Sequence, residues 1–442
     1  MTPPDQADRI TAEDLRPVWT ALDPEERAEA FRLLTPEDGD DLFQGLSTLD
    51  QVEVLRALSP GERRLWVRAL APDDAADLLQ EMPAEERQVW LDLLDESTRR
   101  EVKVLLAYAE DEAGGLMSPR FARIRADMTV DEAIGYLRRQ IQAHLETIYY
   151  AYILDQQQRL AGVVSLRELF AARGVAPVAD VMHRDVISVP ENMDQEQVAG
   201  VFAEHDLVAI PVVDAEGRMK GIVTVDDIVD VVQEEATEDI QKIGGMQALD
   251  APYLQTGFLP MLKKRAGWLA FLFVSGMLTT VTLDHFQAEI VQAGVLAVFM
   301  PLIIASGGNS GSQASTLVIR AMALEEVKLR DWWRVVRREM LFGVALGVIL
   351  AVLGLVRIGL TQVVSGGYGP YQLVLALSVS LSLVGVVVWG TICGSMLPFV
   401  LRRLGLDPAS ASAPFVATLV DVAGLLIYFS VARALLGNMP AG

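Results

Sequence analysis

Residues 414–430 read PFVATLVDVAGLLIYFS, an apolar run with one aspartate, Asp421, in its interior. A carboxylate inside an apolar membrane span costs several kcal/mol, about 2.5–3.5 on insertion scales, unless it faces water or an ion. The run offers no cationic partner before Arg433. We interpret Asp421 as a residue of an ion path; the alternative is an aspartate hydrogen-bonded to a neighbouring span.

This run is the last of five apolar stretches that follow residue 258. They cover residues 266–283, 291–318, 341–360, 373–400 and 412–436. A membrane helix needs about 20 consecutive apolar residues, and four of the five stretches reach that length, while the first can lengthen toward Phe258. The sequence therefore predicts an α-helical membrane domain over residues 258–442 with five spans.

Basic residues mark one side of this domain. Residues 263–265 precede the first run, Arg402 and Arg403 follow the fourth, and six basic residues lie at 320–338, whereas loops 284–290 and 361–372 have neither Lys nor Arg. Because cytoplasmic loops are enriched in Lys and Arg, we expect the first half of the chain in the cytoplasm and the C-terminus outside a cell membrane. The N-terminus, MTPPDQADRI, does not resemble a cleaved signal peptide.

The second run contains MPLIIASGGNSGSQAST, residues 300–316. Pro301 and three glycines within GGNSGSQ are expected to interrupt this helix, because broken backbone at membrane depth is tolerated where it lines an aqueous path. The alternative is that the glycines let two helices approach closely.

Charge is divided between the two halves. Residues 1–250 carry 51 Asp+Glu and 24 Lys+Arg (−27), and residues 251–442 carry 8 and 13 (+5), which gives −22 for the chain. An acidic half repels nucleic acid and attracts cations, although acids kept for solubility give the same balance. Hard carboxylate oxygens suit Mg²⁺. The single cysteine, Cys393, excludes disulfides and cysteine-rich metal sites, and no histidine lies within a span.

The acidic half contains two internal repeats. Residues 22–106 divide into blocks of 12, each typical of one capped short helix, which predicts an α-solenoid over residues 1–112. Residues 113–231 hold two copies of a helix–strand–strand–helix pattern, about 117–172 and 181–231, and resemble a tandem pair of CBS modules. A connecting (plug) helix and linker follow at 232–257. The predicted fold is multidomain: an all-α superhelical N-terminal domain, an α/β tandem CBS domain and an α-helical five-span domain.

Together these motifs resemble the MgtE family of magnesium channels over nearly the whole chain. The resemblance rests on the solenoid, DEAGGLM, the CBS pair, VTVDDIVD, EEATEDI, GGNSGSQ and PFVATLVDVAG. It implies a homodimer in a lipid bilayer that conducts Mg²⁺ and is not an enzyme. The implied pore residues are Asp421, the Ala417 carbonyl and Asn309 as a pore-lining companion.

The family resemblance also implies a self-limiting valve, in which cytoplasmic Mg²⁺ binds between acidic faces and holds the connecting helix against the pore. Two carboxylates about 5 Å apart repel by about 3 kcal/mol at an effective dielectric near 20, and a bridging cation removes that repulsion. The implied regulatory ligands are Asp41, Asp73, Asp77, Gly115, Asp194, Glu196, Ala203, Asp206, Asp226, Asp227, Asp230, Glu235, Glu238, Asp239 and Asp407.

A nucleotide site is a separate expectation. Gly221, Thr224 and Asp227 match the G-x-x-[ST]-x-x-[DN] pattern that many CBS modules use for ribose and phosphate, which favours an ATP-type ligand. The sequence does not assign Asp227 to nucleotide rather than to metal.

Three other functions stay open from the sequence. One is a CBS-regulated transporter of another divalent cation such as Co²⁺ or Mn²⁺. Another is a cation/proton exchanger that uses Asp421. The third is a membrane sensor of metal or nucleotide that transports nothing.

Overall fold

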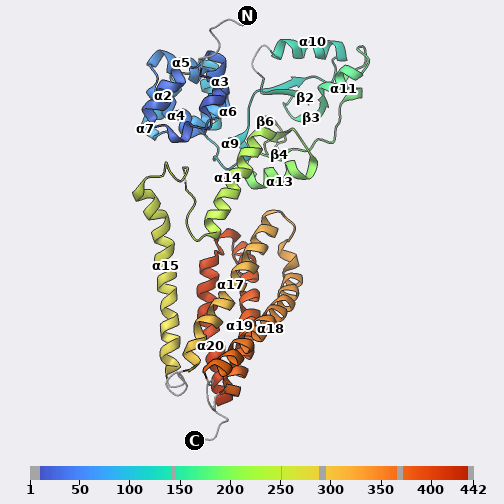
Figure 1. Ribbon diagram of the computed structural model, residues 1–442. Helices are drawn as coiled ribbons and strands as arrows, with labels where there is room; N and C mark the ends of the chain where they lie inside the picture. Colours follow the sequence, from blue (N-terminus) through green and yellow to red (C-terminus); the bar gives the residue numbers. More distant parts are fainter. Residues whose placement is uncertain (1–9, 142–144, 250, 288–294, 366–371, 437–442) are drawn as a thin grey trace, which may run out of the picture. The chain divides into compact units, whose positions relative to one another are not determined.

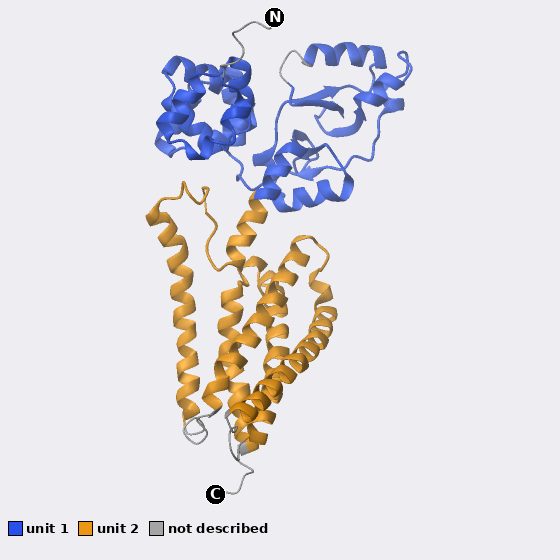
Figure 2. Cartoon of the chain, in the orientation of Figure 1, with its two compact units in different colours: residues 1–233 blue, residues 234–442 orange. Residues whose placement is uncertain are grey.

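The chain forms two compact units, Met1–Gln233 and Glu234–Gly442 (Figure 2). The computed structural model describes residues 10–141, 145–249, 251–287, 295–365 and 372–436. The boundary between the units falls inside helix α14 (Val225–Ile243), so one continuous helix contributes residues to both.

The first part of unit 1 is a solenoid of short helices (Figure 1). Helix N-caps fall at residues 23, 35, 47, 59, 71, 83 and 95, which confirms the predicted 12-residue blocks. At Asp23, Thr35, Ser47, Ser59 and Asp95 the side chain accepts a backbone N–H of the first turn, which satisfies a donor that the helix leaves unpaired. The helices are α1 (Ala12–Leu15), α2 (Pro24–Arg32), α3 (Pro36–Gln44), α4 (Thr48–Ala57), α5 (Pro60–Ala69), α6 (Pro72–Gln80), α7 (Ala84–Leu91) and α8 (Glu96–Leu105), with a 3-10 turn at Trp19–Ala21.

Two CBS modules follow, each with a three-stranded sheet. The sheet orders are β1-β2-β3 and β4-β5-β6, and in each sheet the first pair is parallel and the second antiparallel. The elements of the first module are α9 (Ala113–Leu116), β1 (Phe121–Ile124), α10 (Val130–Ile141), β2 (Thr147–Leu154), β3 (Leu160–Ser165) and α11 (Leu166–Ala171). Those of the second are α12 (Val178–Val181), β4 (Val189–Pro190), α13 (Gln195–His205), β5 (Ala209–Val213), β6 (Met219–Thr224) and α14.

The modules exchange their leading segments in a pseudo-twofold way. Ser118, ahead of the first module, pairs with Ile222 of the second, and His183, ahead of the second, pairs with Val163 of the first. The solenoid core also runs into the second module, because buried Leu105 and Met117 belong to one cluster with Phe202 and Ile210. Solenoid and second module therefore pack as one body within unit 1.

The described residues of unit 2 form five long helices after α14. They are α15 (Phe258–His285), α17 (Val295–Ala323), α18 (Trp332–Ser365), α19 (Gln372–Arg403) and α20 (Ala413–Leu436), with 3-10 turns at Leu329–Asp331 and Pro408–Ser410. Among the described residues, α15, α18 (with its preceding turn), α19 and α20 are long and apolar enough to cross a membrane. Five spans were predicted; α17 is long enough, but its polar run from Ser306 to Gln313 lowers its hydropathy.

The predicted interruption of the second span is wrong, because α17 is helical from Val295 to Ala323 and contains Pro301. Its glycines serve close packing instead. A Cβ at Gly390 would collide with the backbone of Gly307, and one at Gly394 would collide with that of Gly311. These two glycine pairs let the backbones of α17 and α19 touch, which was the alternative interpretation of the motif.

Candidate ion-binding sites

Asp421 lies half-buried in α20, next to a glycine of α17. A Cβ at Gly308 would lie 3.9 Å from Asp421 Oδ1 and 3.5 Å from the Cβ of Ala417, so the missing side chain leaves room in front of the carboxylate. Within the described residues, no hydrogen-bond donor or cationic side chain contacts this carboxylate. The alternative interpretation, an aspartate hydrogen-bonded to a neighbouring span, therefore finds no partner there.

Glycines of α17 set the position of this site. Val416 and Val420 of α20 pack where Gly311 and Gly307 lack side chains, at 2.9 and 2.8 Å from the Cβ positions of those glycines. Asp421 and Ala417, one residue further along α20 in each case, thereby lie opposite Gly308. Asn309, the third predicted pore residue, is exposed in the single chain.

Hydroxyl groups attach the start of α20 to α17. Ser315 Oγ donates to the Ala411 carbonyl at 2.8 Å, and Ser312 Oγ donates to the Ala413 carbonyl at 3.2 Å. Two polar residues of the second span thus fix the start of the helix that carries Asp421.

A second group of acids lies within unit 1, between solenoid and CBS residues. Asp73 is only 7% exposed, and the Ser118 hydroxyl lies 3.3 Å from its Oδ1 and 3.1 Å from Glu146 Oε2. Asp227 accepts from the Thr224 hydroxyl at 2.6 Å. We call this group the unit 1 cluster; its members are Asp73, Asp74, Glu146, Asp226 and Asp227.

These carboxylates raise one another's pKa values. Burial, followed by the charges of Glu146, Asp74 and Asp227, raises the pKa of Asp73 well above its usual range. Burial also raises the pKa of Asp227 to about 7, although its hydrogen bond from Thr224 acts in the opposite direction. Full ionisation of the cluster is therefore unfavourable, and bound protons or a cation would offset the repulsion.

Among the described residues, no basic side chain forms an ion pair with the unit 1 cluster, although the charge of Arg120 acts to lower the pKa of Glu146, which burial raises. In the described part of the chain, Arg120 pairs with Glu101 at 2.9 Å and Lys220 pairs with Asp214 at 3.3 Å, and no ion pair reaches the five cluster members. Among those residues no three His, Cys, Asp or Glu side chains form a set that could hold a metal ion directly.

Other predicted ligands do not all converge on one place. Asp41 is paired with Arg16 at 3.0 Å. Asp194 caps the start of α13 and Asp206 ends it, so they stand about 18 Å apart at 1.5 Å per residue and do not share one ion within a subunit. Glu196 lies near the first end and Ala203 near the second. Asp77 and the buried Gly115 lie near cluster segments, on α6 and α9, and Asp230 lies one turn beyond Asp226 on α14.

A third group lies within unit 2, on the second half of α14. Lys242 Nζ contacts Asp407 Oδ2 at 2.6 Å and also pairs with Glu238. Burial, Asp407 and Glu235 raise the pKa of Asp239 to about 6. The hydrogen bonds to Asp407 and Glu238 raise the pKa of Lys242, although its burial lowers it. We call Glu235, Glu238, Asp239, Lys242 and Asp407 the unit 2 cluster.

The end of α14 also meets the start of α20. Gly245 has φ +78°, and a Cβ added there would lie 3.0 Å from the Trp268 ring and 3.2 Å from Pro414 Cγ. Trp268 Nε1 donates to Ser412 Oγ at 3.2 Å. The connecting segment is therefore packed against the first turn of the helix that carries Asp421.

The predicted nucleotide residues are used inside the fold. A Cβ at Gly221 would lie 2.6 Å from the Ser118 carbonyl, so the segment ahead of the first module covers that glycine. Thr224 is buried and donates to Asp227, which faces Asp73 and Glu146. The surroundings of the Thr224–Asp227 pair are therefore negatively charged.

Sequence reasoning did not find Glu146, Ser118, Lys242 and Gly245. Glu146 and Ser118 lie in connecting segments with no periodic pattern, so only tertiary packing reveals them. Lys242 was detectable, because it lies four residues after Glu238 on one helix face.

Known proteins share this architecture. Residues 300–431 match a family of divalent cation transporters, MgtE, residues 10–111 match the MgtE intracellular N domain, and residues 113–174 and 178–234 match CBS domains.

Several relatives are named magnesium transporter MgtE. The one from Thermus thermophilus is 46% identical over 345 residues (78% of this chain, 74% of the relative), and the one from Enterococcus faecalis is 35% identical over 332 residues (75% and 71%). A crystal structure of the cytosolic domain of the Mg²⁺ channel MgtE in complex with ATP is 44% identical and covers 50% of this chain and 90% of that one, with a TM-score of 0.47. The chain belongs to the MgtE family of divalent cation transporters.

Proposed function

We propose that this chain carries Mg²⁺ passively across a membrane through a path lined by Asp421, and that cytoplasmic Mg²⁺ closes the path by binding the acidic clusters. The observation that carries the proposal is the unpartnered carboxylate of Asp421 beside Gly308, inside a helix apolar enough to cross a membrane. The names of the relatives support the choice of Mg²⁺.

The pore chemistry favours a hydrated divalent ion. Carboxylate and carbonyl oxygens at Asp421 and Ala417 are hard ligands, and Mg²⁺ sheds its water reluctantly, so one acid with space in front of it suits an ion that keeps part of its hydration shell. The inside-negative potential drives entry with about 2.3 kcal/mol per charge per 100 mV, doubled for a divalent ion.

A homodimer is part of the proposal. One carboxylate is a single charged ligand for a divalent ion, and a twofold axis near Asp421 would bring the Asp421 carboxylates of two chains together. The exposed Asn309 would then face the path rather than solvent. We place unit 1 in the cytoplasm and the C-terminus outside, from the basic residues that flank α15, α18 and α19.

Closure by Mg²⁺ follows from linkage. The unit 1 cluster brings acids together without a basic partner, so its packed form binds cations more tightly than a separated form. Each bound ion shifts the equilibrium toward the packed form. Lys242 of α14 pairs with Asp407, and Gly245, just after α14, lies against Trp268 and Pro414; these contacts supply the connection to α20.

The test is Mg²⁺ flux into dye-loaded proteoliposomes that contain wild type or Asp421→Asn. We expect flux to fall at least about tenfold in this variant, because the neutral side chain no longer attracts a divalent ion. Asp331→Asn, at the start of α18, is the matched control and should keep wild-type flux. Unchanged flux in Asp421→Asn would refute the proposed path, and preferred flux of Co²⁺ or Mn²⁺, or flux coupled to protons, would support the other transport functions.

ATP binding is a separate prediction. The Thr224–Asp227 pair faces carboxylates, and a triphosphate there would meet like charge, so the proposal assigns Asp227 to Mg²⁺. Calorimetry with ATP on the wild type tests the prediction, and an absence of heat would remove ATP from the account.

A further inference from the structure

Helix α18 and the turn before it are longer than the hydrocarbon interior of a bilayer requires. With the preceding turn, the candidate span covers Leu329–Val364, 36 residues. At 1.5 Å per residue only about 20 residues are needed to cross the hydrocarbon. Because the basic residues lie at its start, the first turns extend into the headgroup region. Trp332 and Trp333 lie there, 51% and 60% exposed, with rings 5.5 Å apart, as expected of interfacial aromatic residues.

The two faces of α18 differ. One face packs on α19: Cβ atoms at Gly343, Gly347 and Gly354 would lie 2.9, 2.7 and 3.2 Å from atoms of Val388, Val384 and Leu383. The opposite face is exposed and combines a basic part with an apolar part. We call this face the α18 stripe.

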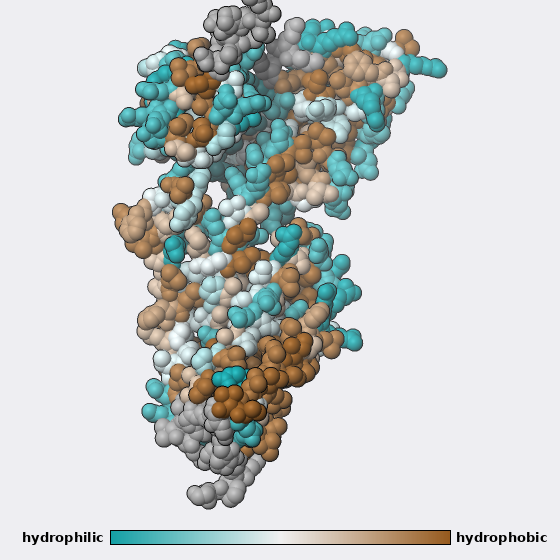
Figure 3. All heavy atoms as spheres, viewed as in Figure 1, coloured by the Kyte–Doolittle hydropathy of each residue, from teal (hydrophilic) through white to brown (hydrophobic). Residues whose placement is uncertain are grey.

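The basic part of the α18 stripe comes first. Arg334, Arg337 and Arg338 are followed by Leu341 at spacings of three and four residues, which places all of them on one side of the helix. The apolar part continues with Leu341, Val344 and Val348, which are 67%, 45% and 49% exposed. In Figure 3 hydrophilic spheres cover the start of α18 and hydrophobic spheres cover the part that follows.

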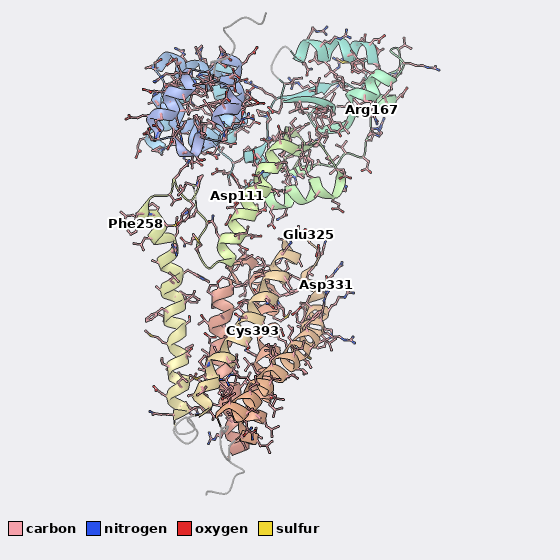
Figure 4. All side chains as sticks on the ribbon, in the orientation of Figure 1. Asp111, Arg167, Phe258, Glu325, Asp331 and Cys393 are labelled. Carbon is pink, nitrogen blue, oxygen red and sulfur yellow. The ribbon has the colours of Figure 1, made fainter. Side chains whose placement is uncertain are left out.

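The arginines of this stripe are poorly neutralised. Lys328 pairs with Glu325 at 3.0 Å, and Arg334 lies 3.7 Å from Asp331 with its side chain 85% exposed. Figure 4 marks Glu325 and Asp331 next to the start of α18. Within the described residues, no carboxylate reaches Arg337 or Arg338 at ion-pair distance, and the Arg338 guanidinium lies 5.7 Å from the Phe342 ring. The segment 328–339 carries five basic residues and two acids, Asp331 and Glu339, a net charge of +3, and Glu339 is close enough to Arg338 to interact with its charge.

We propose that the α18 stripe is a binding site for an anionic phospholipid of the cytoplasmic leaflet. The phosphate and acidic headgroup meet Arg334, Arg337 and Arg338, and an acyl chain lies along Leu341, Val344 and Val348. A second copy of the chain fits this face less well, because a twofold contact would set the basic part against itself. The site is independent of which ion the protein carries.

The test uses the full chain in nanodiscs of phosphatidylcholine that contain a minor fraction of brominated phosphatidylglycerol or, in a parallel sample, of brominated phosphatidylcholine. Bromine quenches nearby tryptophans, and subtraction of the signal of Trp332→Phe/Trp333→Phe isolates the two interfacial residues. Since each basic side chain near the bilayer favours an anionic lipid about fivefold, we expect brominated phosphatidylglycerol to quench them at least about fivefold more effectively at low salt.

Variants locate the effect. In Arg334→Gln/Arg337→Gln/Arg338→Gln the two brominated lipids should quench the tryptophans equally. In the triple Lys variant at these positions, brominated phosphatidylglycerol should remain the more effective quencher. The matched control Lys263→Gln/Arg265→Gln/Arg403→Gln removes three exposed charges outside α18 and should behave as wild type. The proposal is overturned if both lipids quench the wild type equally, or if the preference for phosphatidylglycerol persists in the Gln variant. It is also overturned if neither lipid quenches, which is the result expected when a second copy of the chain covers this face.

Discussion

The two acidic clusters of the molecule are neutralised in different ways. In the unit 2 cluster, Lys242 pairs with Asp407 and Glu238, so the chain itself supplies a cation. In the unit 1 cluster, no ion pair reaches Asp73, Glu146 or Asp227 within the described residues, and the pKa values of these acids are raised. The chain itself partly neutralises the unit 2 cluster, and we propose that an external cation takes that part in the unit 1 cluster.

Removing charge from the unit 1 cluster should have the largest effect on stability. In Asp73→Asn/Asp227→Asn the amide oxygens still accept from Ser118 and Thr224, while repulsion falls by about 2 kcal/mol. We expect the thermal midpoint of the fragment 1–250 without Mg²⁺ to rise by about 5 °C, and the stabilisation by added Mg²⁺ to shrink. Glu25→Gln/Glu29→Gln, exposed acids of α2, is the control. If both variants behave alike, general acidity rather than the cluster is responsible.

The same cluster predicts a pH dependence. The pKa of Asp227 is about 7 in the folded protein against 3.8 in the unfolded chain, and that of Asp73 is also raised, so the folded state binds protons more tightly. This contribution is complete below pH 3.8 and is lost as the pH rises through about 7. Without Mg²⁺ the midpoint of the fragment should therefore fall between pH 5.5 and pH 8, measured by thermal unfolding, and saturating Mg²⁺ should flatten the fall. A midpoint that rises over this interval would contradict the raised pKa values.

Gly245 tests the connection between α14 and α20. An alanine at φ +78° costs about 1–2 kcal/mol and would press on Trp268 and Pro414. We expect Gly245→Ala to raise the cytoplasmic Mg²⁺ concentration that half-suppresses flux about fivefold, with maximal flux unchanged. Gly267→Ala has open space around its Cβ position and serves as control.

Lys242 should give the smallest effect, because its ion pairs are partly exposed. Lys242→Gln leaves the unit 2 cluster without its own cation, so flux at low cytoplasmic Mg²⁺ should rise about twofold while high Mg²⁺ still suppresses it. Lys242→Arg keeps the charge and should match wild type. An unchanged flux in Lys242→Gln would mean that the two clusters do not differ in the proposed way.

Local patterns predicted most of the fold. The 12-residue spacing of caps predicted the solenoid helices, and the repeated helix–strand–strand–helix pattern predicted the two modules, because each pattern is fixed by neighbours along the chain. The prediction that failed concerned Pro301 and the glycines of α17. Their composition is equally typical of a broken helix and of close helix crossing, and only the partner helix, with Gly390 and Gly394, decides between them.

The candidate sites were predictable to a lesser extent. Asp421 stands out because a lone acid in an apolar span has few explanations. The regulatory acids do not stand out, because acids are frequent throughout unit 1 and their significance depends on which of them packing brings together. Asp73 and Asp227 are brought into one cluster with Glu146, whereas Asp41 is paired with Arg16.

The most direct test of the account is the dependence of flux on cytoplasmic Mg²⁺ in full-length wild type and in Asp73→Asn/Asp227→Asn, with Glu25→Gln/Glu29→Gln as control. The account predicts that wild type and control are suppressed as cytoplasmic Mg²⁺ rises, while the flux of the cluster variant no longer changes with it. Suppression of the cluster variant at the wild-type Mg²⁺ concentration would contradict the claim that the uncompensated carboxylates of unit 1 sense the ion.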